Sequence, residues 1–183
     1  MKAPRLAGEQ AQLLVIDLQQ KLLPHIADQE LVIAQTIRML RAARELALPI
    51  TLTEQYPEGL GRTPRAVLAA AEGATRLEKT AFSAWREEPV RRHLLSLSRP
   101  QVLLCGIETH VCVQQTALDL AAAGLTPLVL ADAVGSRRPL DREVSLGRMR
   151  AAEVTVTTVE SAIFELLERA GTDVFKRILP IVR

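Results

Sequence analysis

The chain contains 183 residues, of which 48% are hydrophobic, 24% charged and only 3% aromatic, with a formal net charge of +2. This length predicts a single domain over residues 1–183, able to bury about 70% of its unfolded surface. Basic and acidic residues alternate without a basic tract and aromatic platforms are scarce, which argues against a nucleic-acid partner. With only two cysteines and no leader-like or membrane-length apolar run, we expect a cytoplasmic protein without a membrane partner.

Short apolar segments alternate with amphipathic segments through the first half of the chain. Three of these runs are predicted strands, at residues 11–17, 49–54 and 74–80. A helix is expected after Asp28, a candidate N-cap, and a shorter one after Thr63 and Pro64. Pro89 opens a further predicted helix.

The second half of the chain continues this alternation. Three more strands are predicted at residues 102–105, 125–132 and 153–158, each followed by a helix. The last of these helices is expected to start at a capping box of Thr157 and Glu160. Strands alternating with helices imply right-handed crossovers. The sequence therefore predicts an α/β fold, a Rossmann-like three-layer αβα sandwich around a central, mostly parallel six-stranded sheet.

Polar residues follow the predicted strands. In open parallel sheets, ligands bind outside the carboxyl ends of the strands. The residues expected at that edge are Asp17, Glu54, Lys79, the turn 108–112 and Asp132. We therefore predict the functional site at this edge.

Cys112 lies where a predicted strand turns into a helix. With Thr109 as a candidate N-cap, Cys112 is expected in the first helical turn, whose free N–H groups and dipole lower the pKa of a thiol. The competing interpretation is a small buried hydrophobic residue, a common state for a free cysteine. Cys105, inside the strand, is expected to belong to an inert core.

A cysteine nucleophile needs a proton acceptor and a proton donor for the leaving group. Asp17 can serve as both, and Lys79 placed between them would stabilise both negative charges. Taken singly, Asp17 could instead cap a strand end, and Lys79 could be a surface lysine.

Several motifs occur together in one order: DLQ at 17–19, TEQYPEGLG at 53–61, EKTAFSAW at 78–85, GIETHVCVQQTALDL at 106–120 and ADAVGSR at 131–137. From about residue 11 to about residue 170 the chain resembles the isochorismatase-like cysteine hydrolase superfamily, and within it the isochorismatase-domain proteins of unassigned substrate. The resemblance implies that superfamily's hydrolase fold, a homo-oligomer and a catalytic triad of Asp17, Lys79 and Cys112. It also implies a cis peptide before Glu108 and an oxyanion hole formed by the backbone N–H groups of Glu108 and Cys112.

Departures from the better-known branches narrow the expected chemistry. Nicotinamidases hold a divalent metal with an Asp and histidines after the second strand, where this chain reads TEQYPEGLG. His25, His93 and His110 lack metal-ligand spacing, so we expect no metal and no cofactor. His110 is near Cys112 in sequence, but the helical turn should point it elsewhere. True isochorismatases lack the cysteine, so Cys112 argues against vinyl-ether hydrolysis.

The residues expected to contact substrate are Gln19, Glu54, Tyr56, Phe82 and Trp85. Glu54 would take a substrate amine or ammonium group, and the aromatic residues would form the pocket walls. For Phe82 and Trp85, packing or an oligomer contact is the alternative. The segment 135–137 is expected to shape a loop rather than to contact substrate.

The sequence thus predicts a metal-independent cysteine hydrolase that cleaves a small amide, carbamoyl or related acyl compound through a thioester-type intermediate on Cys112. One alternative is a non-catalytic small-molecule-binding or scaffold protein that retains the fold, although the intact set of Asp17, Lys79 and Cys112 counts against it. Another is a thiol redox sensor based on Cys112, which lacks an accessible resolving cysteine.

Overall fold

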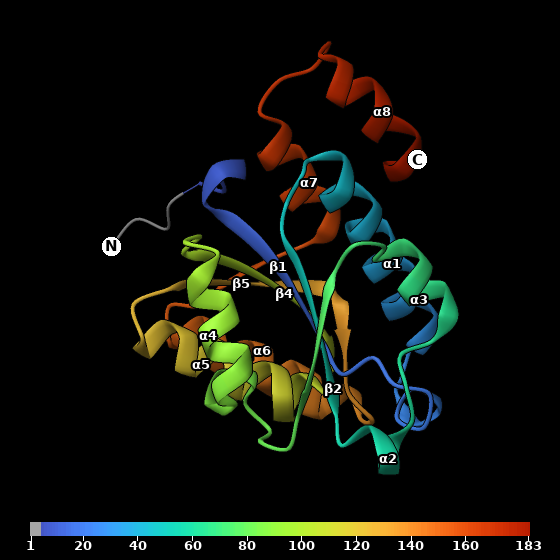
Figure 1. Ribbon diagram of the computed structural model, residues 1–183, viewed down its shortest axis with the longest axis vertical. Helices are drawn as coiled ribbons and strands as arrows, with labels where there is room; N and C mark the ends of the chain where they lie inside the picture. Colours follow the sequence, from blue (N-terminus) through green and yellow to red (C-terminus); the bar gives the residue numbers. More distant parts are fainter. Residues whose placement is uncertain (1–4) are drawn as a thin grey trace.

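The computed structural model describes residues 5–183, and a six-stranded sheet forms its centre (Figure 1). The strands are β1 (Ala11–Ile16), β2 (Ile50–Gln55), β3 (Thr75–Lys79), β4 (Gln101–Ile107), β5 (Thr126–Gly135) and β6 (Thr155–Thr157). Their order is β3-β2-β1-β4-β5-β6, and every neighbouring pair is parallel. The predicted α/β sandwich around a six-stranded parallel sheet is confirmed.

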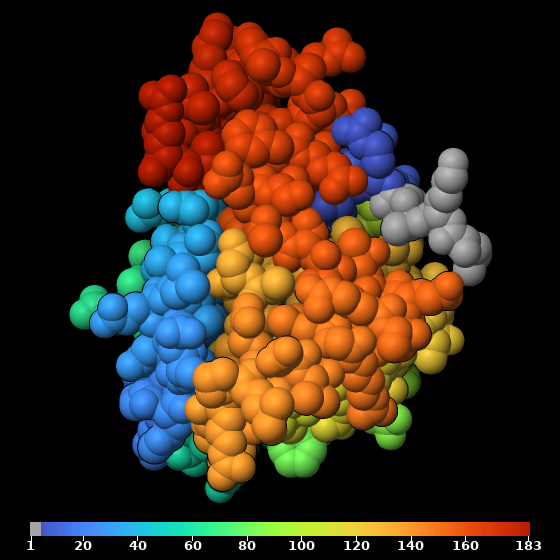
Figure 2. Space-filling view, turned by 180° about the vertical axis from the view of Figure 1, so that it is seen from behind, coloured from blue at the N-terminus to red at the C-terminus, as the bar shows by residue number. Residues whose placement is uncertain are grey.

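Helices cover both faces of this sheet. One face carries α1 (Gln29–Glu45), α3 (Arg65–Ala70) and α7 (Val159–Leu167), and α8 (Asp173–Val182) packs against α1 and α7. The other face carries α4 (Glu88–Ser96), α5 (Gln114–Ala122) and α6 (Pro139–Ala151). The short α2 (Pro57–Leu60) lies past the carboxyl end of β2, and the 3-10 turns are η1 (Gly8–Gln10), η2 (Leu23–His25) and η3 (Ala84–Arg86). Figure 2 shows the opposite side, where segments of α1, α6, α7 and α8 form the surface. None of the helices described is long and apolar enough to cross a bilayer.

The two central strands, β1 and β4, are buried along their whole length, which explains their unbroken apolar runs. In β1, Leu13 and Val15 belong to the core on the α1 side, whereas Leu14 and Ile16 belong to the core on the α5 side. A shift of one residue would exchange these two sets of side chains. Burial on both faces therefore fixes the register, and with it the position of the strand ends.

β5 is longer than the sequence predicts. It continues to Gly135, and its pairing with β4 is irregular between Leu104 and Gly106. Asp132, predicted to end this strand, lies inside it and accepts a hydrogen bond from Val159 N at Oδ1 (2.9 Å). The expectation that Asp132 ends this strand at the functional edge is therefore wrong, because β5 continues past it and its carboxylate binds the first N–H group of α7.

Two predicted helix caps also differ from the structure. Thr158, not Thr157, caps α7, since its side chain accepts a hydrogen bond from Ser161 N, so the predicted capping box is wrong. Asp28 stands at the N-cap of α1 but makes no side-chain capping bond. Its left-handed backbone, with φ of 54°, differs from the extended conformation that capping side chains usually need.

Gly106 lies where β4 passes β1, just before the turn that carries Cys112. Its φ is +119°, and a Cβ at this position would lie 2.0 Å from Ile16 O. Only glycine fits both this conformation and this approach. The close contact allows β4 to deliver the following turn next to the end of β1.

Candidate active site

The carboxyl ends of three strands bring the predicted catalytic side chains together. Asp17 directly follows β1, Lys79 is the last residue of β3, and Cys112 lies in the turn after β4. Lys79 Nζ lies 2.7 Å from Asp17 Oδ2, and both side chains are fully buried. Cys112 is close enough to interact with both of these groups. This edge of the sheet therefore combines a carboxylate, an ammonium group and a thiol almost out of reach of bulk water.

Asp17 is also held by β2. Its N–H donates to Thr53 O (3.1 Å), and Thr53 Oγ1 donates to Asp17 Oδ1 (2.8 Å). Burial raises the pKa of Asp17 above its ordinary value of 3.8, although Lys79, Thr53 and Cys112 act in the opposite direction. A raised pKa makes the carboxylate a stronger base, which suits proton transfer near neutral pH.

Lys79 is surrounded by hydrogen-bond acceptors. In addition to its ion pair with Asp17, its Nζ donates hydrogen bonds to Gln55 Oε1 (2.5 Å), Phe82 O (3.0 Å) and Ala81 O (3.1 Å). Gln55 is not among the residues predicted from the sequence. Its position directly after the second predicted strand could have indicated this contact, because Gln55 in β2 is the register partner of Lys79 in β3.

Cys112 lies in η4 (Thr109–Val113), a π-helical turn that precedes α5. The predicted cap at Thr109 is wrong, because Glu108 occupies the N-cap position of this turn. The side chain of Cys112 is only 7% exposed. Burial, and then the negative charge of Asp17, raise the pKa of the thiol to about 12. The lowered pKa predicted from the helix start is therefore wrong, since burial and the charge of Asp17 raise the pKa of the thiol instead.

Cys105 provides an internal comparison. It is fully buried in β4, as predicted, and burial raises its pKa to about 12 as well. Both cysteines are free thiols. What distinguishes Cys112 is therefore its two charged neighbours, Asp17 and Lys79, rather than an unusual acidity of its own.

The turn that leads to Cys112 starts with a cis peptide between Ile107 and Glu108, as the resemblance implies. Glu108 O accepts hydrogen bonds from Val111 N (3.1 Å) and Val113 N (3.2 Å).

The polar side chains of this turn contact the loop after β5. Glu108 Oε2 accepts from Arg137 Nε (3.1 Å) and Arg137 N (3.3 Å). His110 Nδ1 lies 3.0 Å from Ser136 Oγ. These contacts agree with the expectations that His110 is directed elsewhere and that residues 135–137 shape a loop.

Gln19, expected to contact substrate, is fully buried and makes internal hydrogen bonds. Its Nε2 donates to Gln55 O (2.9 Å) and Gly61 O (2.7 Å), and its Oε1 accepts from Gln55 N (2.7 Å). These three bonds use most of the capacity of the amide. Gln19 therefore ties the segment after β1 to the segment after β2.

Glu54, expected to bind a substrate amine, is likewise engaged inside the protein. Its Oε1 accepts from Thr63 N and Thr63 Oγ1, both at 2.8 Å, and its Oε2 accepts from Arg62 Nη1 at 2.9 Å. Burial alone would raise the pKa of Glu54, but these hydrogen bonds from Thr63 and Arg62 hold it below its ordinary 4.5. Glu54 could take a substrate amine only by giving up bonds that hold the 55–63 segment.

The three aromatic residues expected at the pocket lie in different environments. Tyr56 and Phe82 are 56% and 57% exposed, whereas Trp85 is half-buried against the core on the α5 side. Tyr56 N donates to Lys79 O (2.9 Å), and Phe82 O accepts from Lys79 Nζ. Tyr56 and Phe82 therefore contact Lys79 through backbone atoms and expose their side chains. Trp85 instead packs against the core, which was the alternative role predicted for it.

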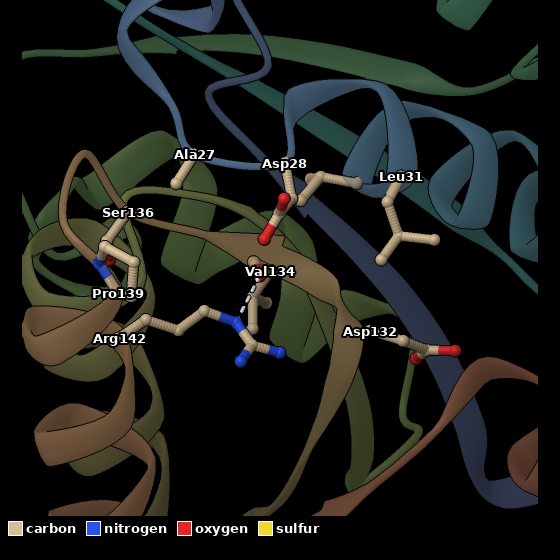
Figure 3. Close-up of a pocket in the computed structure, with 9 residues that line it drawn as sticks. Ala27, Asp28, Leu31, Asp132, Val134, Ser136, Pro139 and Arg142 are labelled. Carbon is tan, nitrogen blue, oxygen red and sulfur yellow. Dashed lines mark hydrogen bonds between the residues drawn. The ribbon is translucent and has the colours of Figure 1, made fainter.

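A separate hollow of about 150 Å³ lies between the start of α1 and the β5–α6 connection (Figure 3). Asp28 and Asp132 are its acidic residues, and Arg142 donates to Val134 O (3.0 Å) at its wall. None of the predicted catalytic residues lines this hollow. In the part of the chain that is described, no three His, Cys, Asp or Glu side chains are grouped to hold a metal ion.

Residues 11–161 match the family described as Isochorismatase domain. The chain belongs to the isochorismatase family. This membership supports a hydrolase-type function.

Relatives in the isochorismatase family align over nearly the whole chain. Isochorismatase domain-containing protein 2A of Mus musculus is 42% identical over 180 residues, which are 98% of this chain and 85% of the mouse protein. A solved structure described as MAR1 ribonuclease from Caenorhabditis elegans is 36% identical, with a TM-score of 0.92 over 98% of this chain and 92% of that one. The YcaC protein of Escherichia coli, described as an octameric hydrolase of unknown specificity, shares the fold at 24% identity, with a TM-score of 0.89 over 96% and 91% of the two chains.

Proposed function

We propose that this isochorismatase family protein is a metal-independent cysteine hydrolase that cleaves a small amide, carbamoyl or related acyl compound at Cys112. The observation that carries the proposal is the buried pair of Lys79 and Asp17, 2.7 Å apart, beside the Cys112 thiol. Burying an ion pair is often no more stabilising than well-packed apolar residues. A pure scaffold would have little use for these charges, which favours an enzyme over the binding-protein alternative.

The first half of the proposed reaction forms a thioester. Because the pKa of the thiol is about 12, Cys112 attacks the carbonyl carbon as its proton moves to Asp17, rather than as a standing thiolate. The carbonyl oxygen becomes an oxyanion that accepts hydrogen bonds from the N–H groups of Glu108 and Cys112, and one such donor typically lowers the barrier by about 3–4 kcal/mol. Asp17 then gives the proton to the leaving nitrogen as the C–N bond breaks.

The second half regenerates the thiol. A water molecule attacks the thioester carbon while Asp17 takes one of its protons, and the proton returns to sulfur as the C–S bond breaks. The products are the carboxylic acid and the amine released earlier. Lys79 keeps its charge throughout and compensates the negative charge that passes between Asp17 and the oxyanion. Tyr56 and Phe82, which are exposed and contact Lys79 through backbone atoms, supply apolar walls for the substrate in this proposal.

Mass spectrometry after rapid quenching tests this mechanism. A panel of small amides, carbamoyl compounds and esters is offered to the protein, and an acyl adduct is expected on Cys112. Cys112→Ala should abolish turnover of any substrate found, whereas Cys105→Ala should retain it. Cys105 is the matched control because its pKa is raised just as far but it does not share the Asp17–Lys79 pair. Full activity in Cys112→Ala would refute the mechanism.

The description of the Caenorhabditis elegans relative raises RNA hydrolysis as a second candidate function. Aromatic residues make up only 3% of this chain, which offers few surfaces for base stacking. Incubating wild-type and Cys112→Ala proteins with RNA separates the two candidates. We expect no cleavage by either protein, and cleavage that is lost in Cys112→Ala would replace the small-amide proposal.

We further propose that the protein is a cytoplasmic homo-oligomer. The Escherichia coli protein of the same fold is described as octameric. Two free thiols suit a reducing compartment. Light scattering measures the mass of the purified assembly, and a monomer at micromolar concentration would contradict this part of the proposal.

A further inference from the structure

Gln55 has contacts that distinguish it from a general structural residue. Its Oε1 accepts from Lys79 Nζ (2.5 Å), and its Nε2 donates to Thr80 O (2.7 Å). A backbone carbonyl only accepts hydrogen bonds and an ammonium group only donates them. The two partners therefore fix the orientation of the amide and present its oxygen to Lys79.

Gln19 fixes Gln55 in turn. It holds both backbone polar groups of Gln55, through Gln55 N (2.7 Å) and Gln55 O (2.9 Å). Gln19 itself is fully buried and anchored to Gly61 O (2.7 Å). Two amides in series thus connect the segment after β1 to the Lys79 side chain at the end of β3.

The ammonium group of Lys79 carries three protons, and it is surrounded by three hydrogen-bond acceptors and the Asp17 carboxylate. Gln55 Oε1 and Asp17 Oδ2 are the nearest, at 2.5 and 2.7 Å, and the carbonyls of Phe82 and Ala81 follow at 3.0 and 3.1 Å. A buried ammonium without acceptors would lose its proton or turn toward solvent. Gln55 is neutral, so it can hold the cation in place without cancelling the charge that Asp17 and Cys112 experience.

We propose that Gln55 is a positioning residue for Lys79, which it holds between Asp17 and Cys112, and that Gln19 supports it. The inference rests on the proposed function insofar as Lys79 and Cys112 act in one site. A further titratable group near this ammonium is Glu87, whose Oε2 accepts from Thr80 N (2.9 Å) and Ala81 N (3.2 Å).

Alkylation of Cys112 by iodoacetamide provides the first test, because it needs no substrate. Lys79 favours the thiolate, and a rise of one unit in the pKa of a thiol lowers its thiolate fraction about tenfold at a fixed lower pH. We expect Gln55→Met to slow alkylation about tenfold at about pH 8.5. In a Lys79→Met background, the same change should cause no further slowing. Gln20→Met, an exposed glutamine next to Gln19, is the matched control and should keep the wild-type rate.

Acylation of Lys79 provides a second readout that does not depend on Cys112. Acetic anhydride at limiting concentration should label Lys79 several-fold faster in Gln55→Met than in wild type, with Lys21 and Lys176 of the same molecules as exposed references. Gln55→Glu keeps an acceptor for the ammonium group and should restore slow labelling. A residue needed only for folding would not give this rescue.

The outcomes separate the two proposals. The inference is overturned if folded Gln55→Met retains both the wild-type alkylation rate and slow labelling of Lys79, or if it slows alkylation equally with and without Lys79. If Cys112 is alkylated no faster in wild type than in Lys79→Met, the proposed function loses its support, while the labelling of Lys79 still decides the role of Gln55. If Gln55→Met does not fold, Gln55→Glu alone decides, since fast labelling of Lys79 in that protein contradicts the inference.

Discussion

Lys79 Nζ lies 2.7 Å from Asp17 Oδ2, and neither side chain is reached by solvent. A buried charge left without its partner is far less stable than either the pair or no charge at all. The two residues are therefore expected to be strongly coupled in their effect on the free energy of unfolding.

Lys79→Met should destabilise the protein by about 3–5 kcal/mol in urea unfolding, because it leaves Asp17 unpaired. The double variant Asp17→Asn/Lys79→Met should lose less than the sum of the two single changes. Lys176→Met is the control, since Lys176 is exposed and its pair with Asp173 should contribute only about 0.5 kcal/mol or less. Additive losses in the double variant would show that the two charges act independently.

The pH dependence of stability follows from the raised pKa of Asp17. Its pKa in the folded state lies above the ordinary 3.8, so the folded state binds more protons than the unfolded state between the two values. This contribution makes the protein less stable as the pH rises through that window. Asp17→Asn lacks the titration, so the stability of wild type relative to Asp17→Asn should fall as the pH increases above about 4. A difference that stays flat or grows with pH would contradict the raised pKa.

Glu54 should show the opposite dependence. Its pKa lies below 4.5 in the folded protein, so its contribution is present above that value and lost as the pH falls through the lower folded pKa. Glu54→Gln should cost about 2 kcal/mol near neutral pH, because it weakens bonds from Thr63 and Arg62 to a charged group. Chemical unfolding at several pH values should show this cost shrinking on acidification. Glu143→Gln, on the exposed side of α6, serves as the control, and an equal cost at all pH values would exclude a role for the Glu54 charge.

Gly106 and Gly147 provide a matched pair of glycine-to-alanine changes. Gly106→Ala should cost more than about 3 kcal/mol or prevent folding, since its Cβ would collide with Ile16 O in a backbone conformation that alanine rarely adopts. Gly147 lies inside α6, where an added Cβ would have no neighbour within 4 Å, so Gly147→Ala should stabilise by up to about 1 kcal/mol. Thermal melting curves of both variants check the contrast. A mild effect at Gly106 would mean that β1 and β4 can separate there without loss.

Much of the fold is predictable because its signals are local. The apolar run before Asp17 predicts a buried strand whichever strands it pairs with, and the run before Gly106 does the same. Parallel strands place their carboxyl ends at one edge, so residues as distant in sequence as Asp17, Lys79 and Cys112 can be expected to meet. This convergence needs no knowledge of the loops.

The remaining features depend on how deeply a residue is buried and on where its side chain points, and the hydrophobic periodicity of the sequence indicates neither. The position of Cys112 at the start of a helix is visible in the sequence, but its burial, which decides the sign of its pKa shift, is not. The π-helical turn changes the spacing by a single residue and leaves no pattern in hydrophobicity. The hydrogen-bond partners of Gln19 and Gln55 cannot be predicted from the neighbouring sequence. An amide can both donate and accept, so its partners depend on which groups surround it in the folded protein.

The site takes one residue from the end of each of four strands or from the turn after it: Asp17, Gln55, Lys79 and Cys112. The last of these strands, β4, pairs with β1 and so brings Cys112 to the site. A growing polypeptide that has not yet completed β4 contains Asp17 and Lys79 but not Cys112. A released fragment that begins after β3 contains Cys112 alone, as an ordinary exposed thiol. The proposed hydrolysis would therefore require one chain that contains β1, β3 and the turn after β4 together.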